Sequence, residues 1–242
     1  KNRKGFMKKI LGLLRNTIDE NKLISDGETI AVGISGGKDS MSLLYELNKY
    51  SKFSNFDFNV HAVKINLGSE TKKENEILKE FCEKINVPLT IKETDIKKIV
   101  FDIREEKNPC SLCANMRRGA LATTLNELGI KKLALGHHKN DKIETFFMNM
   151  FFSGRLNTFK MKSYLSRQDI TVIRPFYEVE EWMIKKFIKK FDIPIITSNC
   201  PVDKDTKREE MKQYLNKTYK EFKPSKKSIE NALKNEDQFN LF

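Results

Sequence analysis

The sequence predicts an α/β protein built on a parallel sheet with helices on both faces. Short apolar runs alternate with longer stretches of helical periodicity over most of the chain, which is the pattern of strands joined by crossover helices. One strand-to-helix junction carries a glycine turn, and sheets of this class bind ligands beyond the carboxyl ends of their strands. A chain of 242 residues is long enough for one such domain with additions.

The N-terminal half opens with an amphipathic helix and continues as alternating strands and helices. Apolar side chains recur at helical spacing in two of its segments, so each presents one face to a core. Asp26-Gly27 predicts a turn just before the first apolar run. In this half the predicted helices are residues 4–24, 41–50 and 74–85, and the predicted strands are residues 29–34, 59–66 and 89–94.

The C-terminal half repeats the alternation and ends in a polar tail, which predicts a short helix from Pro224 onward. The density of phenylalanines in 146–152 favours core packing over base stacking. The predicted helices here are residues 111–128, 141–152 and 179–191, and the predicted strands are residues 132–136 and 170–174. The predicted domains are a basic amphipathic N-terminal helix (1–26), an α/β domain (27–200) and a helical C-terminal extension (201–242).

The most informative segment is the turn Ser35-Gly36-Gly37-Lys38-Asp39-Ser40, which links the first predicted strand to a helix. Glycines adopt backbone angles that let neighbouring N–H groups point at one anion, and a helix N-terminus favours phosphate. Lys38 adds a cation, and the two serines add hydroxyl donors. The segment therefore predicts a phosphate-binding site.

This turn differs from a Walker A motif. Val32 stands where the first glycine of that motif belongs, and Asp39 stands where its hydroxyl residue belongs. A carboxylate repels polyphosphate unless a cation lies between them. Asp39 therefore predicts a bound magnesium ion.

The charge balance favours a polyanionic partner, because lysine and arginine exceed the acidic residues by 12. Lysine-rich solvated faces are the alternative, and the mixed charges of 72–84 fit that alternative. No apolar run approaches the ~20 residues of a membrane span, and no signal-peptide core follows the basic N-terminus. We therefore expect a cytoplasmic protein without a membrane partner.

Three of the four cysteines predict a metal or redox site. Cys110 and Cys113 form a Cys-x-x-Cys at a helix start, and Cys200 follows another apolar segment in a loop. Three cysteines could hold a [4Fe–4S] cluster with one iron left open, or zinc with one of the two adjacent histidines. A thioredoxin-like pair is a third alternative. Cys82 lies on the apolar face of its helix and is predicted to be a core residue.

Several polar side chains follow these segments. His137 and His138 lie at the end of a predicted strand, where neighbours point to opposite faces, so we expect only one, His138, to face the crevice. Basic residues near the cysteine pair and the phenylalanine segment either bind RNA phosphates or form solvated faces. The candidate RNA-binding residues are Arg117, Arg118, Arg155 and Lys160, with Lys162 and Arg174 as weaker candidates.

Together these motifs resemble the tRNA 2-thiocytidine synthetases, a branch of the PP-loop ATP pyrophosphatase superfamily. The likeness runs from the first helix to about Leu215. It rests on SGGKDS (35–40), CSLCANMRRG (110–119), GHHKNDKIETFFMNMFFSG (136–154), VIRPF (172–176) and Cys200.

The resemblance implies a PP-loop fold and a two-step reaction. ATP adenylates the C2 oxygen of a cytidine at tRNA position 32, and sulfur then replaces that oxygen. It also implies a [4Fe–4S] cluster on Cys110, Cys113 and Cys200, magnesium on Asp39, and an Asp141 that shares this metal or orients ATP. The implied partners are tRNA, a sulfur donor (a cysteine desulfurase or free sulfide) and a second copy in a homodimer.

The chain departs from the family pattern at several points: the segment after Gly154 lacks the family's paired prolines, and the residues around Cys200 differ from the better-known members. Asn140 replaces the first of two acids after the histidines, and Gly68 stands where an acid is usual. These departures concern the target nucleotide more than the reaction type. The alternatives are thiolation of another tRNA nucleoside of the 2-thiouridine type, a lysidine synthetase, an adenylyl-sulfate reductase, and a non-catalytic zinc- or nucleotide-dependent RNA-binding protein.

Overall fold

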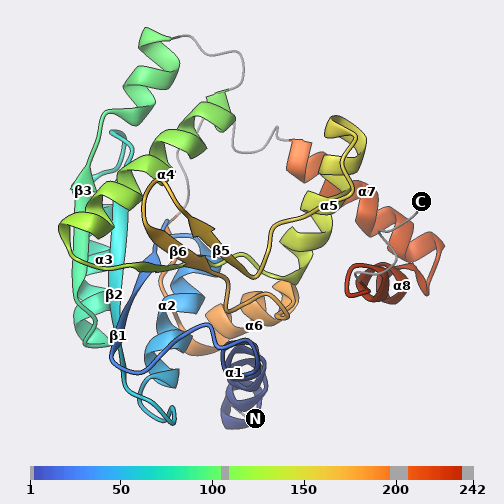
Figure 1. Cartoon of the computed structure of the whole chain (residues 1–242), viewed down its shortest axis with the longest axis horizontal. Helices are drawn as coiled ribbons and strands as arrows, with labels where there is room; N and C mark the ends of the chain where they lie inside the picture. Colours follow the sequence, from blue (N-terminus) through green and yellow to red (C-terminus); the bar gives the residue numbers. More distant parts are fainter. Residues whose placement is uncertain (1–2, 105–108, 197–206, 236–242) are drawn as a thin grey trace. The chain divides into compact units, whose positions relative to one another are not determined.

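The computed structural model describes residues 3–104, 109–196 and 207–235 (Figure 1). The chain forms two compact units: Lys1–His138 with Met161–Asn199, and Lys139–Lys160 with Cys200–Phe242. The predicted domain boundaries after residues 26 and 200 stay a prediction. None of the helices in the described residues is long and apolar enough to cross a membrane.

The first unit is built on a six-stranded sheet in the order β3-β2-β1-β4-β6-β5 (Figure 1). β5 runs antiparallel to β6, and all other neighbours are parallel. The predicted α/β class is confirmed. The strands are β1 Glu28–Gly33, β2 Phe58–Asn66, β3 Leu89–Glu93, β4 Lys132–Ala134, β5 Lys162–Leu165 and β6 Ile170–Ile173.

Five of these strands match the five predicted apolar runs, and β5 was not predicted. β5 has four residues, KSYL, and its side chains are exposed or only half-buried. It pairs with one neighbour at the edge of the sheet. A short edge strand buries little apolar surface, so its sequence carries no clear alternation.

Helices cover both faces of the sheet. Four of them pack on one core with Ile30 and Val32 of β1: α1 Arg3–Glu20, α2 Lys38–Tyr50, α3 Lys72–Lys84 and α6 Glu181–Phe191. The other face packs on a second core, which includes Ala31 of β1, α4 Pro109–Glu127 and the π-helical turn η1 Lys98–Ile103. Alternate residues of one strand thus enter opposite cores, as expected of a sheet buried on both sides.

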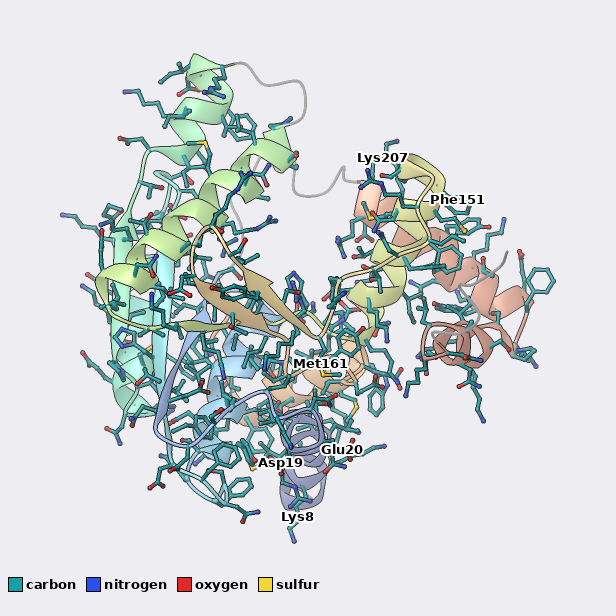
Figure 2. All side chains as sticks on the ribbon, in the orientation of Figure 1. Lys8, Asp19, Glu20, Phe151, Met161 and Lys207 are labelled. Carbon is teal, nitrogen blue, oxygen red and sulfur yellow. The ribbon has the colours of Figure 1, made fainter. Side chains whose placement is uncertain are left out.

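The second unit consists of α5 Lys139–Ser153, α7 Lys207–Glu221 and α8 Ser225–Ala232. Its core is small and holds Ile143, Met211 and Leu215. Phe151 and Phe152, at the end of α5, are 51% and 56% exposed, so the prediction of core packing is wrong for these two rings. Phe151 packs against Tyr214 of α7, and Lys207 lies over the Phe152 ring (Figure 2).

One acidic side chain lies entirely inside the first unit. Glu46 of α2 is 0% exposed. Its Oε1 accepts a hydrogen bond from Ser42 Oγ at 3.1 Å, and its Oε2 has no hydrogen-bond partner. Burial raises the pKa of Glu46 well above its usual value, although the Ser42 hydroxyl acts in the opposite direction. The folded protein therefore favours the neutral acid.

Replacing Glu46 by glutamine should stabilise the protein more at pH 8 than at pH 5. The folded-state pKa of Glu46 exceeds the unfolded value of about 4.3, so wild-type stability is lost as the pH rises between the two. Glutamine does not ionise, and the difference in unfolding free energy should grow by at most about 1.4 kcal/mol per pH unit. Urea denaturation at pH 5, 6.5 and 8 measures it. Glu20→Gln, at an exposed site on α1, is the control, and a pH-independent difference would contradict the prediction.

Candidate active site

The turn between β1 and α2 can only be built with glycine. Gly36 has φ +85°, and a Cβ there would lie 2.8 Å from Ile196 Cβ. The Ile196 N–H donates to the Gly36 carbonyl at 2.9 Å, so the chain that follows α6 packs directly on the turn. Gly37 is the N-cap residue of α2. The predicted strand, glycine turn and helix are confirmed, and the turn lies at the carboxyl end of β1.

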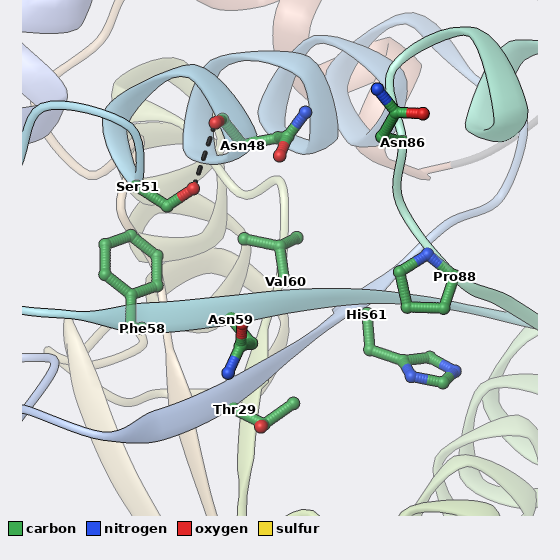
Figure 3. Close-up of a pocket in the computed structure, with 9 residues that line it drawn as sticks. All are labelled: Thr29, Asn48, Ser51, Phe58, Asn59, Val60, His61, Asn86 and Pro88. Atoms are coloured by element: carbon green, nitrogen blue, oxygen red, sulfur yellow. Dashed lines mark hydrogen bonds between the residues drawn. The ribbon is translucent and has the colours of Figure 1, made fainter.

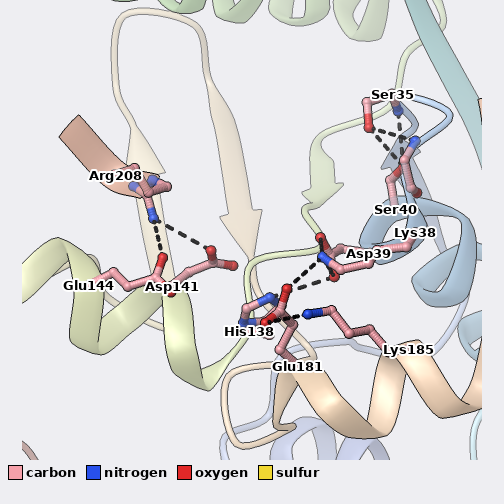
Figure 4. Close-up of polar contacts among 11 residues, drawn as sticks. Ser35, Lys38, Asp39, Ser40, His138, Asp141, Glu144, Glu181, Lys185 and Arg208 are labelled. Atoms are coloured by element: carbon pink, nitrogen blue, oxygen red, sulfur yellow. Dashed lines mark hydrogen bonds and ion pairs between the residues drawn. The ribbon is translucent and has the colours of Figure 1, made fainter. Parts of the chain in front are cut away.

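Two serine hydroxyls hold the turn in shape. Ser40 Oγ donates to the Gly37 carbonyl at 3.0 Å and accepts the Ser35 N–H at 3.1 Å. Ser35 Oγ accepts the Gly37 N–H at 3.2 Å (Figure 4). These bonds close the loop on itself before any ligand binds, and such preorganisation lowers the entropy cost of binding a phosphate.

Lys38 lies in a cluster of acidic side chains. Its Nζ lies 2.8 Å from Asp39 Oδ2 and 3.1 Å from Glu181 Oε1 (Figure 4). Burial alone would lower the pKa of Lys38, but Asp39 and Glu181 outweigh it and raise that pKa. Lys185 Nζ also pairs with Glu181, at 3.2 Å. Lys38 is thus held as a cation, and Glu181 is a site residue that sequence reasoning missed.

The end of β4 packs against the start of α2. A Cβ on Gly136 would lie 2.9 Å from the carbonyl carbon of Asp39, so only glycine allows this approach. His138 is 3% exposed, and its Nε2 lies 3.6 Å from Asp39 Oδ1. His137 instead accepts a hydrogen bond from Arg174 Nε at 3.3 Å. His138 therefore faces the glycine turn, as expected from the alternation of side chains.

A buried pair supports the turn from β2. Lys64 Nζ donates to the Ser35 carbonyl at 3.2 Å and lies 3.8 Å from Glu70 Oε1. Burial opposes the ionisation of Glu70, but hydrogen-bond donors and Lys64 outweigh it and hold the pKa of Glu70 below its usual value. The backbone donors to Glu70 Oε2 are the N–H groups of Leu67, Gly68 and Ser69. Sequence reasoning missed both Lys64 and Glu70.

Cys110 and Cys113 lie on the first turn of α4, the former exposed and the latter half-buried. Two thiols three residues apart at a helix start can bind one metal or cluster. Arg117 follows one turn later. Burial lowers the pKa of Arg117, while Cys113 and Glu70 act in the opposite direction, so both lie within its electrostatic reach.

Arg117 is within electrostatic range of Cys113 and Glu70, and Glu70 lies 3.8 Å from Lys64, which donates to the carbonyl of Ser35. Cys200 lies outside the described residues. Within residues 3–104, 109–196 and 207–235 no three His, Cys, Asp or Glu side chains form a metal site. The two described thiols suit a metal cluster, and the identity of the metal stays a prediction.

Comparison with known proteins places this geometry in a family. Residues 5–219 match the family described as a PP-loop domain. A tRNA-cytidine(32) 2-sulfurtransferase of Dichelobacter nodosus is 40% identical over 210 residues, which cover 86% of this chain and 78% of that protein. The protein of that name from Aliivibrio fischeri (strain MJ11) is 38% identical over 232 residues, 95% of this chain and 75% of the relative.

The chain belongs to the PP-loop family, in the branch of the tRNA-cytidine(32) 2-sulfurtransferases. Among solved structures, the U34-tRNA thiolase NcsA from Methanococcus maripaludis, determined with its [4Fe–4S] cluster, has a TM-score of 0.76 at 23% identity. The match covers 96% of this chain and 80% of NcsA. At this identity the likeness supports the PP-loop fold alone.

The second unit of the PP-loop chain carries further predicted residues. Asp141 and Glu144 both lie 3.5 Å from Arg208 Nη1 (Figure 4). Arg155 and Lys160 are exposed. The role of Asp141 at the nucleotide stays a prediction, because the contact described for it is with Arg208 of its own unit.

A pocket of about 360 Å³ lies at the opposite edge of the PP-loop sheet (Figure 3). It is lined by residues at the amino-terminal ends of β1 and β2, including Thr29, Phe58 and Asn59. None of the predicted site residues lines it. Ligands of parallel α/β sheets bind at the carboxyl ends of the strands, so we place the active site at the glycine turn.

Proposed function

We propose that this protein is an ATP-dependent tRNA sulfurtransferase that converts the cytidine at position 32 of the anticodon loop to 2-thiocytidine. One observation carries the proposal. The glycine turn, with Lys38, Asp39 and His138, occurs together with a cysteine pair at the start of α4 in a chain that is 40% identical to a protein of this name. A nucleotide site beside a metal-binding site is what an activated sulfur transfer requires.

The first step activates the base. The C2 oxygen of cytidine is a poor leaving group, and it becomes a good one when it attacks the α-phosphorus of ATP and pyrophosphate departs. Lys38 and backbone amides of the glycine turn stabilise the charge on the phosphates. Asp39 would hold a magnesium ion, which would offset the negative charge of the phosphates. His138 orients Asp39.

Asp141 is the second proposed acidic group at the nucleotide. Its place rests on the spacing His138-x-x-Asp141 in the sequence. In this role it shares the magnesium ion or orients ATP.

The second step replaces the activated oxygen. Sulfur bonds to C2, the C–O bond breaks, and AMP leaves with the oxygen. Cys110 and Cys113, with Cys200 as the third ligand, would hold a [4Fe–4S] cluster, and the exposed first turn of α4 suits this role. When bound, such a cluster would supply the sulfur that replaces the activated oxygen. Arg117 supplies positive charge beside Cys113.

The remaining assignments concern partners. Arg118, Arg155 and Lys160 are exposed and are proposed to contact tRNA phosphates, together with Arg117. The sulfur donor is a cysteine desulfurase or free sulfide, and the protein acts as a homodimer in the cytoplasm, where its tRNA substrate occurs.

The proposal is tested with the anaerobically reconstituted protein, ATP, magnesium, sulfide and unmodified tRNA. Mass spectrometry of the nucleosides should find 2-thiocytidine, with one AMP released for each sulfur added. If the sulfur is found on a uridine, the enzyme is of the 2-thiouridine type instead. Stoichiometric zinc without pyrophosphate release would replace the proposal by the non-catalytic alternative.

A further inference from the structure

Arg174 lies just after β6, beside the segment that follows β4. Its Nε donates to His137 Nδ1 at 3.3 Å, and its Nη1 donates to Ser163 Oγ of β5 at 3.4 Å. All three side chains are half-buried, so they are held in place and still reach solvent. The guanidinium of Arg174, the imidazole of His137 and the hydroxyl of Ser163 thus meet near the carboxyl ends of β4 and β6, beside β5.

A second guanidinium comes from α4. Burial lowers the pKa of Arg174 to about 10, Tyr177 acts in the opposite direction, and Arg118 lowers that pKa further. Arg118 therefore lies close enough to repel Arg174, although the two residues belong to different elements. Arg118 itself is exposed. A bound anion would relieve unfavourable interactions between two guanidinium groups.

The hydrogen bonds show which atoms of Arg174, His137 and Ser163 can donate to a ligand. His137 Nδ1 accepts from Arg174, so the neutral ring carries its proton on Nε2, which is then a donor. The guanidinium N–H groups and the Ser163 hydroxyl are donors as well. Arginine forks bind phosphate oxygens in pairs, and positioning contacts to RNA are made mostly to phosphates. The chemistry fits a phosphate group.

The two adjacent histidines have different partners, which distinguishes the Arg174 cluster from the glycine turn. His138 faces Asp39, on the side of the sheet covered by α2 and α6. His137 instead contacts Arg174, which lies just after β6. Gly136, next in the chain, touches the Asp39 backbone, so the two groups are near neighbours at one edge. An anion at Arg174 therefore lies beside the nucleotide without sharing its site.

We infer that Arg174, Arg118 and His137 bind a phosphodiester of the substrate RNA next to the nucleotide that is modified. This inference rests on the proposed function. A phosphate fixed on the face of α4 positions the adjoining base between the glycine turn and the cysteine pair, and correct positioning contributes strongly to rate. Arg174 is thus a binding residue for RNA, and the nucleotide turn binds ATP independently.

The test compares tRNA binding by the holoenzyme and its Arg174→Gln variant at several salt concentrations. The variant should bind about tenfold more weakly, and the slope of log K against log salt should fall by about one. Arg174→Lys should keep the slope and recover part of the affinity, because the charge remains and the fork is lost. Arg15→Gln, at an exposed arginine of α1, is the matched control and should change neither quantity.

The affinity for ATP, measured on the same samples, should stay unchanged. Unaltered tRNA binding by Arg174→Gln and Arg118→Gln would overturn the inference, as would a loss of ATP affinity in place of RNA affinity. If Arg174→Gln does not fold, the exposed Arg118→Gln variant decides the question alone. A wild-type protein that binds ATP and no tRNA would overturn the proposed function as well, so the two failures are distinguishable.

Discussion

Replacing Asp39 by asparagine should lower the rate of tRNA thiolation by roughly 10³-fold while the protein stays folded. The amide keeps the size of the side chain and removes the charge. That charge is the partner of Lys38 at 2.8 Å and the proposed ligand of the magnesium ion. Formation of AMP and pyrophosphate should fall with thiolation, because both steps depend on the same activation. Single-turnover assays with saturating tRNA measure this effect.

Asp169→Asn is the matched control for this experiment. Asp169 lies in an exposed turn, pairs with Lys131 at 2.8 Å and has φ +53°. Asparagine tolerates this backbone angle, so the same chemical change there should leave the rate unaltered. Thiolation retained by Asp39→Asn would remove Asp39 from the mechanism.

Replacing Cys113 by alanine should remove the cluster. The holoenzyme should contain about four irons per chain and be brown under anaerobic conditions, whereas the variant should hold less than one iron and be colourless. Iron analysis and the visible absorption spectrum measure this directly, without any assay of activity. Thermal unfolding separates the loss of metal from the loss of fold.

Cys82→Ala is the control for the cysteine experiment. Cys82 is buried in the core, and burial raises the pKa of its thiol to about 11, so it is a poor metal ligand. Its replacement should keep the iron content. A Cys113→Ala protein with full iron, or a wild-type protein with stoichiometric zinc, would contradict the cluster assignment.

Local sequence signals predicted the parts of the site that depend on short segments. The glycine turn could be predicted because its residues follow an apolar strand directly and meet a helix N-terminus. The cysteine pair could be predicted because two thiols within one helical turn are a metal-binding pattern by themselves. In both cases the residues that interact are neighbours in the chain.

The residues that support these segments had no such signal. Lys38 meets Glu181, and Ser35 meets Lys64, across long separations in sequence that only the folded sheet closes. Nothing in the alternation of residues 59–66 distinguishes Lys64, a buried cation, from a solvated lysine. Strand β5 was not predicted for a related reason, because a four-residue edge strand forms through its pairing with β6 and has no distinct pattern of its own.

Glu70 also offers a physical explanation for the glycine at position 68, where the family usually has an acid. Gly68 has φ +99°, a conformation that side chains rarely adopt, so a glycine suits this position. Two residues later Glu70 provides the carboxylate that binds the loop N–H groups and Lys64. The loop after β2 is thus tied to the glycine turn by an acid at a neighbouring position.

In the proposed reaction, ATP activates the same oxygen that sulfur replaces. The most direct measurement uses an anticodon stem-loop with ¹⁸O at C2 of the target cytidine, and mass spectrometry of the AMP released during thiolation. AMP should carry one ¹⁸O atom for each 2-thiocytidine formed. Unlabelled AMP alongside the thiolated product would contradict it.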